Sequence, residues 1–282
     1  MGVKNFKKNM SFEPPHFFEK GVKNMAIQSY YDFKLGDRLL SDFGGVLSIE
    51  ENYKTDIKPA LNVATEKIVG YDGEIPYSAT YDPRVINLHM KFKNNDLNAD
   101  ELTSWLKSRK PQWFNYIGSD RKIEVICKDE LELSTYSPTH HSMELTLYAY
   151  NPYWVEIEPY IWLQNAPVVN QQYVFMNSGN EKSYPLIKFS SNQTVTEVKF
   201  EVNGVPYKIS EIQGEIVIDC KYGTVYKQLP EQKRINKLNT FSCTDTNKNK
   251  YYMPILNVGS NTFKLLSSSL DNVKIQCNSR WI

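Results

Sequence analysis

The chain has 282 residues, of which 41% are hydrophobic, and its 33 Lys and Arg residues nearly balance its 32 Asp and Glu residues. The resulting net charge of +1 argues against a sequence-specific nucleic-acid binder, because such proteins concentrate an excess of basic residues. The hydrophobic share excludes a disordered or acidic tail protein, and the length suggests about two domains.

Residues 1–25 form an N-terminal extension ahead of the first strand pattern. They combine Lys4, Lys7 and Lys8 with several Phe residues, and they lack the apolar run of a signal peptide. We expect this extension to be an arm that orders on a neighbouring protein. The alternatives are a floppy tail, or a true start at Met25.

Alternating apolar and polar residues predict strands in the first half of the chain. Every second side chain is apolar from Ile86 to Phe92, and the same period recurs from Met143 to Ala149. A period of two is typical of strands with one buried and one solvated side.

One helix is predicted between these strands. Asn98, followed three residues later by Glu101, matches a capping box, in which each residue caps a backbone N–H of the other. The apolar stripe of this helix contains Trp105, and the helix should end by Lys110 because Pro111 follows.

A domain boundary is predicted near Trp154. Beyond it, short strands alternate with turn residues about every ten positions, which favours a β-sandwich. Asn203-Gly204, between two alternating runs, predicts a tight hairpin. The predicted fold is therefore mainly β, with an α+β domain over residues 26–154 and a β-sandwich over residues 155–282.

No motif predicts catalysis, a metal site or a cofactor. The spacing of Cys127, Cys220, Cys243 and Cys277 matches no zinc module, and we expect reduced, buried thiols and cytosolic folding. Nucleophile elbows, metalloprotease motifs and phosphate-binding loops are all missing, so we predict that the chain is not an enzyme. No apolar stretch is long enough for a membrane helix, and we expect no membrane partner.

The aromatic residues are the remaining candidates for binding. Tyr160 and Trp162 share strand parity, so in a strand both would lie on one face, where their rings could stack on sugars. The alternative for this pair is packing in the core or between the domains.

Several motifs together resemble the distal tail (Dit) proteins of long-tailed bacteriophages. In the first half they are Phe33-Lys34-Leu35-Gly36-Asp37-Arg38, Asp42-Phe43-Gly44, Val69-Gly70-Tyr71-Asp72-Gly73-Glu74, Tyr81-Asp82-Pro83-Arg84-Val85-Ile86 and Tyr148-Ala149-Tyr150-Asn151-Pro152-Tyr153-Trp154. In the second half they are Asn177-Ser178-Gly179-Asn180, Tyr184-Pro185-Leu186-Ile187, Leu256-Asn257-Val258-Gly259-Ser260-Asn261 and Arg280-Trp281. Their order and spacing cover residues 26–282, whereas residues 1–25 depart from the family pattern.

The resemblance implies a structural hub protein of the virion tail tip, made in the host bacterial cytoplasm. It implies a homo-hexameric ring, formed by the domain of residues 26–154, that joins the tail tube protein to the tail-associated hub protein and the receptor-binding apparatus. It also implies that the second domain is a galectin-like sandwich, which in some members binds a receptor-binding protein or a host surface glycan.

From this resemblance we expect ring or tube contacts at five residues, namely Phe33, Leu35, Phe43, Trp113 and Tyr116. The alternative function is a carbohydrate-binding module for attachment to the host wall, with Tyr160 and Trp162 as its contacts.

Overall fold

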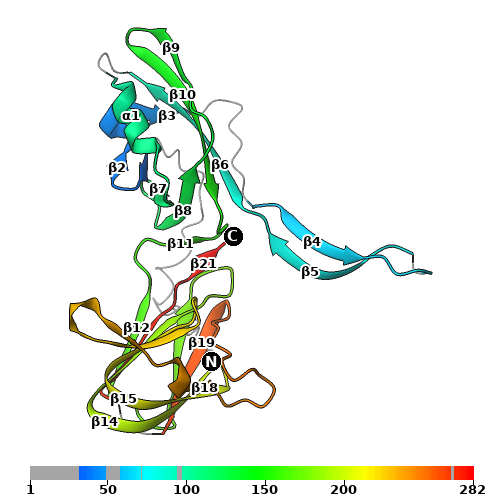
Figure 1. Ribbon diagram of the computed structural model, residues 1–282, viewed down its shortest axis with the longest axis vertical. Helices are drawn as coiled ribbons and strands as arrows, with labels where there is room; N and C mark the ends of the chain where they lie inside the picture. The colour runs from blue at the N-terminus through cyan, green and yellow to red at the C-terminus, as the bar shows by residue number, and fades with distance from the viewer. Residues whose placement is uncertain (1–31, 49–57, 71, 94–96, 268–269) are drawn as a thin grey trace, which may run out of the picture.

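The computed structural model describes residues 32–48, 58–70, 72–93, 97–267 and 270–282. Figure 1 shows an elongated molecule with two β-rich bodies along its long axis and a two-stranded hairpin that projects sideways. The described residues contain a single α-helix, and strands make up most of the rest, which confirms the predicted mainly β fold. The N-terminal extension of residues 1–25 lies outside the described residues.

The first body is built on an antiparallel sheet, and the buried side chains of this sheet form one apolar cluster with those of the helix α1 (Ala99–Leu106). The path of this sheet is β2 (Arg38–Leu39), β1 (Phe33–Leu35), β7 (Gln112–Tyr116), β8 (Arg121–Cys127), β10 (His140–Ala149), β6 (Arg84–Phe92) and β3 (Gly45–Leu47). The strands β9 (Leu133–Ser137), β11 (Trp154–Glu156) and β21 (Arg280–Trp281) lie off this path, since β9 pairs with β10 and β11 pairs with both β8 and β21.

The predicted alternation in this sheet is confirmed. In β6 the apolar residues from Ile86 to Phe92 are buried, and so are those of β10 from Met143 to Ala149. The two strands pair in register, with Leu145 opposite Leu88, so their apolar faces form one side of the core.

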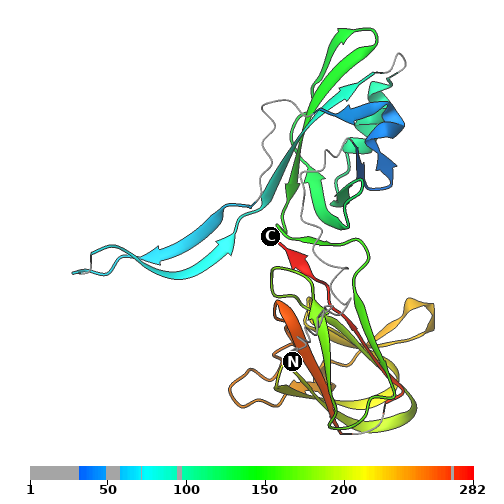
Figure 2. The ribbon, with the colours of Figure 1, turned by 180° about the vertical axis from the view of Figure 1, so that it is seen from behind.

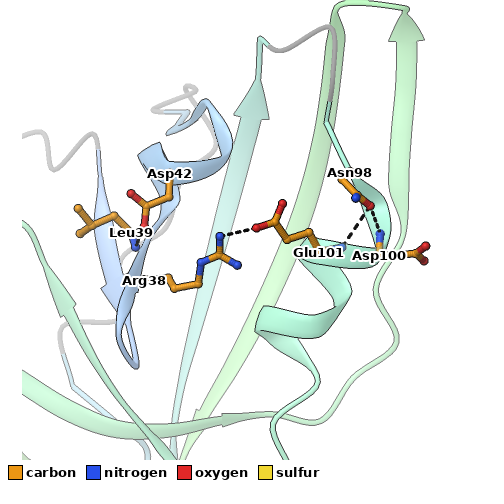
Figure 3. Close-up of polar contacts among 6 residues, drawn as sticks. All are labelled: Arg38, Leu39, Asp42, Asn98, Asp100 and Glu101. Carbon is orange, nitrogen blue, oxygen red and sulfur yellow. Dashed lines mark hydrogen bonds and ion pairs between the residues drawn. The ribbon is translucent and has the colours of Figure 1, made fainter.

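The predicted helix is α1 (Ala99–Leu106), and it packs on the sheet beside a 3₁₀ helix, η1 (Leu40–Phe43). The Asn98 side chain accepts hydrogen bonds from the N–H groups of Asp100 (2.9 Å) and Glu101 (3.3 Å). The carboxylate of Glu101 pairs with Arg38 at 2.5 Å (Figure 3). Asn98 is therefore the N-cap, as predicted, while Glu101 ties the helix to β2.

The second body is a curled sheet of nine strands. Its path is β12 (Ile161–Asn165), β20 (Asn272–Gln276), β14 (Leu186–Val202), β15 (Val205–Asp219), β16 (Thr224–Gln228) and β17 (Arg234–Asn236). Off this path lie β13 (Gln172–Asn177), β18 (Phe241–Cys243) and β19 (Gly259–Ser267), together with the 3₁₀ helices η2 (Pro230–Gln232) and η3 (Leu238–Thr240).

The expectation of short strands is wrong for β14 and β15, which run 17 and 15 residues. The first part of β14 pairs with β20 and its last part pairs with β19, so the sheet folds over on itself. A large apolar cluster fills the interior. The Asn203-Gly204 hairpin is confirmed, because both residues have positive φ (52° and 77°) between the paired Val202 and Val205.

The projecting hairpin consists of β4 (Leu61–Glu66) and β5 (Ile75–Tyr81), and it forms a separate two-stranded sheet. Figures 1 and 2 show it extending away from both bodies, in the segment that leads into β6.

Candidate assembly surfaces

Three of the five expected contact residues lie inside the first body. The side chains of Phe33, Leu35 and Phe43 are 0%, 2% and 4% exposed. The ring of Trp105, from α1, stacks on Phe33 and Phe43 with centroid distances of 5.7 and 4.7 Å. Its indole N–H donates to the Leu35 carbonyl at 2.9 Å. These residues fix the helix on the sheet, so their direct contribution is to the core of the subunit.

The other two expected contact residues lie on β7. Trp113 is 44% exposed, and the ammonium of Lys122 lies 4.8 Å from its ring centroid. Tyr116 is half-buried and packs against Phe114 and Trp154, at centroid distances of 4.9 and 6.2 Å. Trp113 is therefore the most exposed of the five side chains.

The expected sugar-binding pair does not share an exposed face. Trp162 is half-buried and points into the second body, where Phe175 and Phe263 lie 5.5 and 5.8 Å from its ring centroid. Tyr160 precedes β12 and is 45% exposed, and partial burial raises the pKa of its hydroxyl. Core packing explains Trp162, and glycan contact by the pair stays a prediction.

The projecting hairpin carries an exposed apolar surface. Every residue of β4 and β5 is at least partly exposed, and most are exposed. The large apolar side chains that it exposes, counting its connecting loop, are Leu61, Val63, Ile68, Val69, Ile75 and Tyr77. A solitary two-stranded hairpin is only marginally stable in water, and exposed apolar surfaces of this kind are typical of interaction sites.

Contacts hold this hairpin to the rest of the molecule at its base. Tyr81, at the end of β5, packs edge-on against Tyr153 with a centroid distance of 6.3 Å. Near the tip, the Thr65 hydroxyl donates to Glu74 at 2.5 Å, which joins the two strands to each other. The hairpin is thus braced internally, while its apolar side chains remain accessible.

Sequence reasoning missed this hairpin although it noted the motif at its tip. Neither strand has a buried face, so the alternation that revealed β6 and β10 is missing here. The usable signal was two β-prone runs on either side of Gly70 and Gly73, both of which have positive φ (84° and 98°).

A second apolar surface lies on the edge strands of the second body. In β12 the side chains of Ile161 and Leu163 are about half exposed, and in β13 those of Val174 and Met176 are more than half exposed. Because β12 and β13 end their sheet paths, each also presents an unpaired strand edge.

Burial favours the neutral form of two thiols, those of Cys220 and Cys277. Desolvation raises the pKa of Cys277 to about 12, and it raises that of Cys220 well above its ordinary value. Since the thiolate is the nucleophile, these two groups are poor nucleophiles. Within the described ranges, no group of three or more His, Cys, Asp or Glu side chains is placed to hold a metal ion, and no helix has the length and apolarity to cross a membrane.

Solved structures similar to this chain include a phage Dit protein and two phage baseplates. The Dit protein of phage SPP1, described as a paradigm of the hub adsorption apparatus in phages that infect Gram-positive bacteria, matches with a TM-score of 0.66 at 10% identity, covering 89% of this chain and 99% of that one. Chains of the phage p2 baseplate in its activated conformation, with Sr and with Ca, both give a TM-score of 0.46, at 9% and 10% identity, covering 88% and 89% of this chain and 99% of theirs.

No family model matches the chain, and no curated protein is significantly similar to it. The match to the SPP1 protein shows that this chain has the fold of a Dit protein. The resemblance noted in the sequence is thereby confirmed at the level of the fold.

Proposed function

We propose that this chain is a structural subunit of a phage, or phage-derived, tail tip. Six copies form a ring through the domain of residues 26–154, and the ring joins the tail tube protein to the tail-associated hub protein and the receptor-binding apparatus. The domain of residues 155–282 faces outward. The observation that carries the ring is the exposed apolar hairpin of β4 and β5, on a chain with the Dit fold.

The hairpin supports assembly because its apolar side chains have no cover within the described part of the subunit. Burying such side chains against a second copy yields roughly 25 cal/mol for each Å² removed from water. A projecting arm and the surface that receives it are different parts of the subunit, so the contact is head-to-tail unless two copies exchange their arms. Contacts of this kind close into a ring when the rotation between copies permits.

The role proposed here is structural and not catalytic. A ring subunit works through interface area, for which exposed aromatic and apolar side chains such as Tyr77 and Trp113 are suited. The buried, neutral thiols of Cys220 and Cys277 are consistent with such a role.

The hairpin proposal is tested with the double variant Val63→Asp, Tyr77→Ser. Both side chains are exposed, at 41% and 70%, so we expect folding stability to change by less than about 0.5 kcal/mol. Charge and polarity placed in an apolar contact should raise the concentration needed for assembly at least about tenfold. Light scattering measures the assembly, and circular dichroism checks the fold.

The matched control is Tyr222→Ser, which changes a 69% exposed tyrosine on the second body. This variant should assemble like the native protein. If the hairpin variant also assembles normally, the hairpin is not the ring contact.

A further inference from the structure

The two bodies are joined by two strands that run side by side. The chain leaves the first sheet through β11 and comes back to it through β21, where Trp154 pairs with Trp281 and Val155 pairs with Arg280. Figure 1 shows β11 and β21 between the two bodies. Although β21 is short, its residues contact both of them.

On the side of the first body, β21 is held by aromatic and cationic contacts. Trp281 is 9% exposed, and the Arg121 guanidinium, from β8, lies 4.1 Å from its ring centroid. The Arg280 guanidinium lies 4.2 Å from the ring of Tyr153, the residue just before β11. Stacked cations and rings of this kind stabilise most when they are partly desolvated.

On the side of the second body, the loop of residues 179–184 contacts β21. The guanidinium of Arg280 donates to the Lys182 carbonyl, at 2.8 Å from Nε, and lies 4.9 Å from the ring of Tyr184. The Glu181 N–H donates to the Arg280 carbonyl at 3.2 Å. Arg280 is therefore held between the two bodies.

The same loop makes two further close contacts with residues 280–282. The N–H of Ile282 donates to the Asn180 side chain at 2.9 Å. Gly179 is packed so closely that a Cβ there would lie 2.3 Å from the Arg280 carbonyl oxygen. No larger residue fits at this position without moving the loop away from β21.

We propose that residues 280–282 act as a clasp that fixes the orientation of the two bodies relative to each other. Domains joined through limited contacts usually move relative to one another. Here Arg280 is hydrogen-bonded to the loop of the second body, while its neighbour Trp281 packs on the sheet of the first body. A displacement of the second body therefore moves the first body as well, whereas a flexible hinge would let the second body move alone. The inference goes beyond the ring and concerns a single subunit.

The test is hydrogen exchange on the full chain, comparing Arg280→Ala with the control Arg234→Ala. Arg234 also stacks on a ring, that of Tyr226 at 4.4 Å, but it lies on β17, away from the clasp. We expect exchange at least about tenfold faster in residues 153–160 and 276–282 of the clasp variant only. Exchange in β6 and β14 should be unchanged.

A second variant changes the loop of residues 179–184, and it tests the proposal independently in case Arg280→Ala misfolds. Gly179→Ala should produce the same local acceleration, and it should increase the radius of gyration measured by small-angle scattering. The control Ser178→Ala changes an exposed neighbour and should alter neither measurement. Unchanged exchange in both clasp variants would overturn the proposal, and so would acceleration spread evenly over the chain in Gly179→Ala.

Discussion

Glu156 lies at the end of β11, where the chain leaves the first sheet. Burial raises the pKa of its carboxyl, and the charge of Asp120 acts in the same direction. The N–H of Tyr160, at 2.9 Å, together with the Ser279 hydroxyl and the Arg121 charge, opposes this rise without cancelling it. The fold therefore favours the neutral acid.

The sign of the pH dependence follows from this raised pKa. The carboxyl contributes most stability below its unfolded pKa of about 4.3, and the contribution is lost as pH rises through the folded pKa. We predict that Glu156→Gln raises the free energy of unfolding at pH 7 by at most about 1 kcal/mol, because the group is only half-buried. The gain should vanish near pH 4.

Urea unfolding between pH 4 and pH 8 measures this effect, with Glu158→Gln, an exposed neighbour, as the control. A Glu156→Gln variant that becomes less stable than the native protein as pH rises would contradict the assignment.

Single residues also show how far sequence reasoning reaches. The alternation of β7 places Trp113 and Phe114 on opposite faces, and the structure finds 44% and 0% exposure. The pattern does not say whether an apolar face meets the subunit's own core or a neighbour. Phe33 and Phe43 were expected at contacts from the family resemblance, and Trp105 of the same chain covers both of them.

At the scale of elements, α1 depends on its cap. Asn98→Ala removes the acceptor for two helix N–H groups and should lower the free energy of unfolding by about 1 kcal/mol. Asn98→Asp keeps an oxygen there and should leave stability nearly unchanged. Thermal unfolding of both variants checks this, and equal losses in the two would show that capping is not the cause.

The long strands β14 and β15 show why element lengths were missed. Residues 191–194 are all polar, yet the strand continues through them with a shift in register between Ser191 and Val195. The Ser191 hydroxyl donates to the Gln193 carbonyl at 2.8 Å, and the Asn192 N–H donates to Asp271 at 2.7 Å. One local bond and one tertiary bond thus replace the interrupted ladder, and local turn signals do not record the tertiary bond to Asp271.

At the scale of the whole molecule, two bodies each bury an apolar core, while the hairpin of β4 and β5 exposes its apolar side chains. The bodies bury nearly all the apolar residues that alternation predicted, so the fold class was accessible from sequence. The hairpin and the clasp were not, because the hairpin has no buried face and the clasp joins residues that lie far apart in the sequence, such as Lys182 with Arg280 and Trp154 with Trp281. The near-zero net charge suits a subunit packed among copies of itself, since a large single-sign charge would repel them.

The central claim, ring assembly, is tested most directly by the mass of the purified native protein. Light scattering over a range of concentrations should find a species of six times the 32.8 kDa chain, and electron microscopy class averages should show sixfold symmetry. A chain that remains monomeric at every concentration, or a ring of another symmetry, would contradict the account.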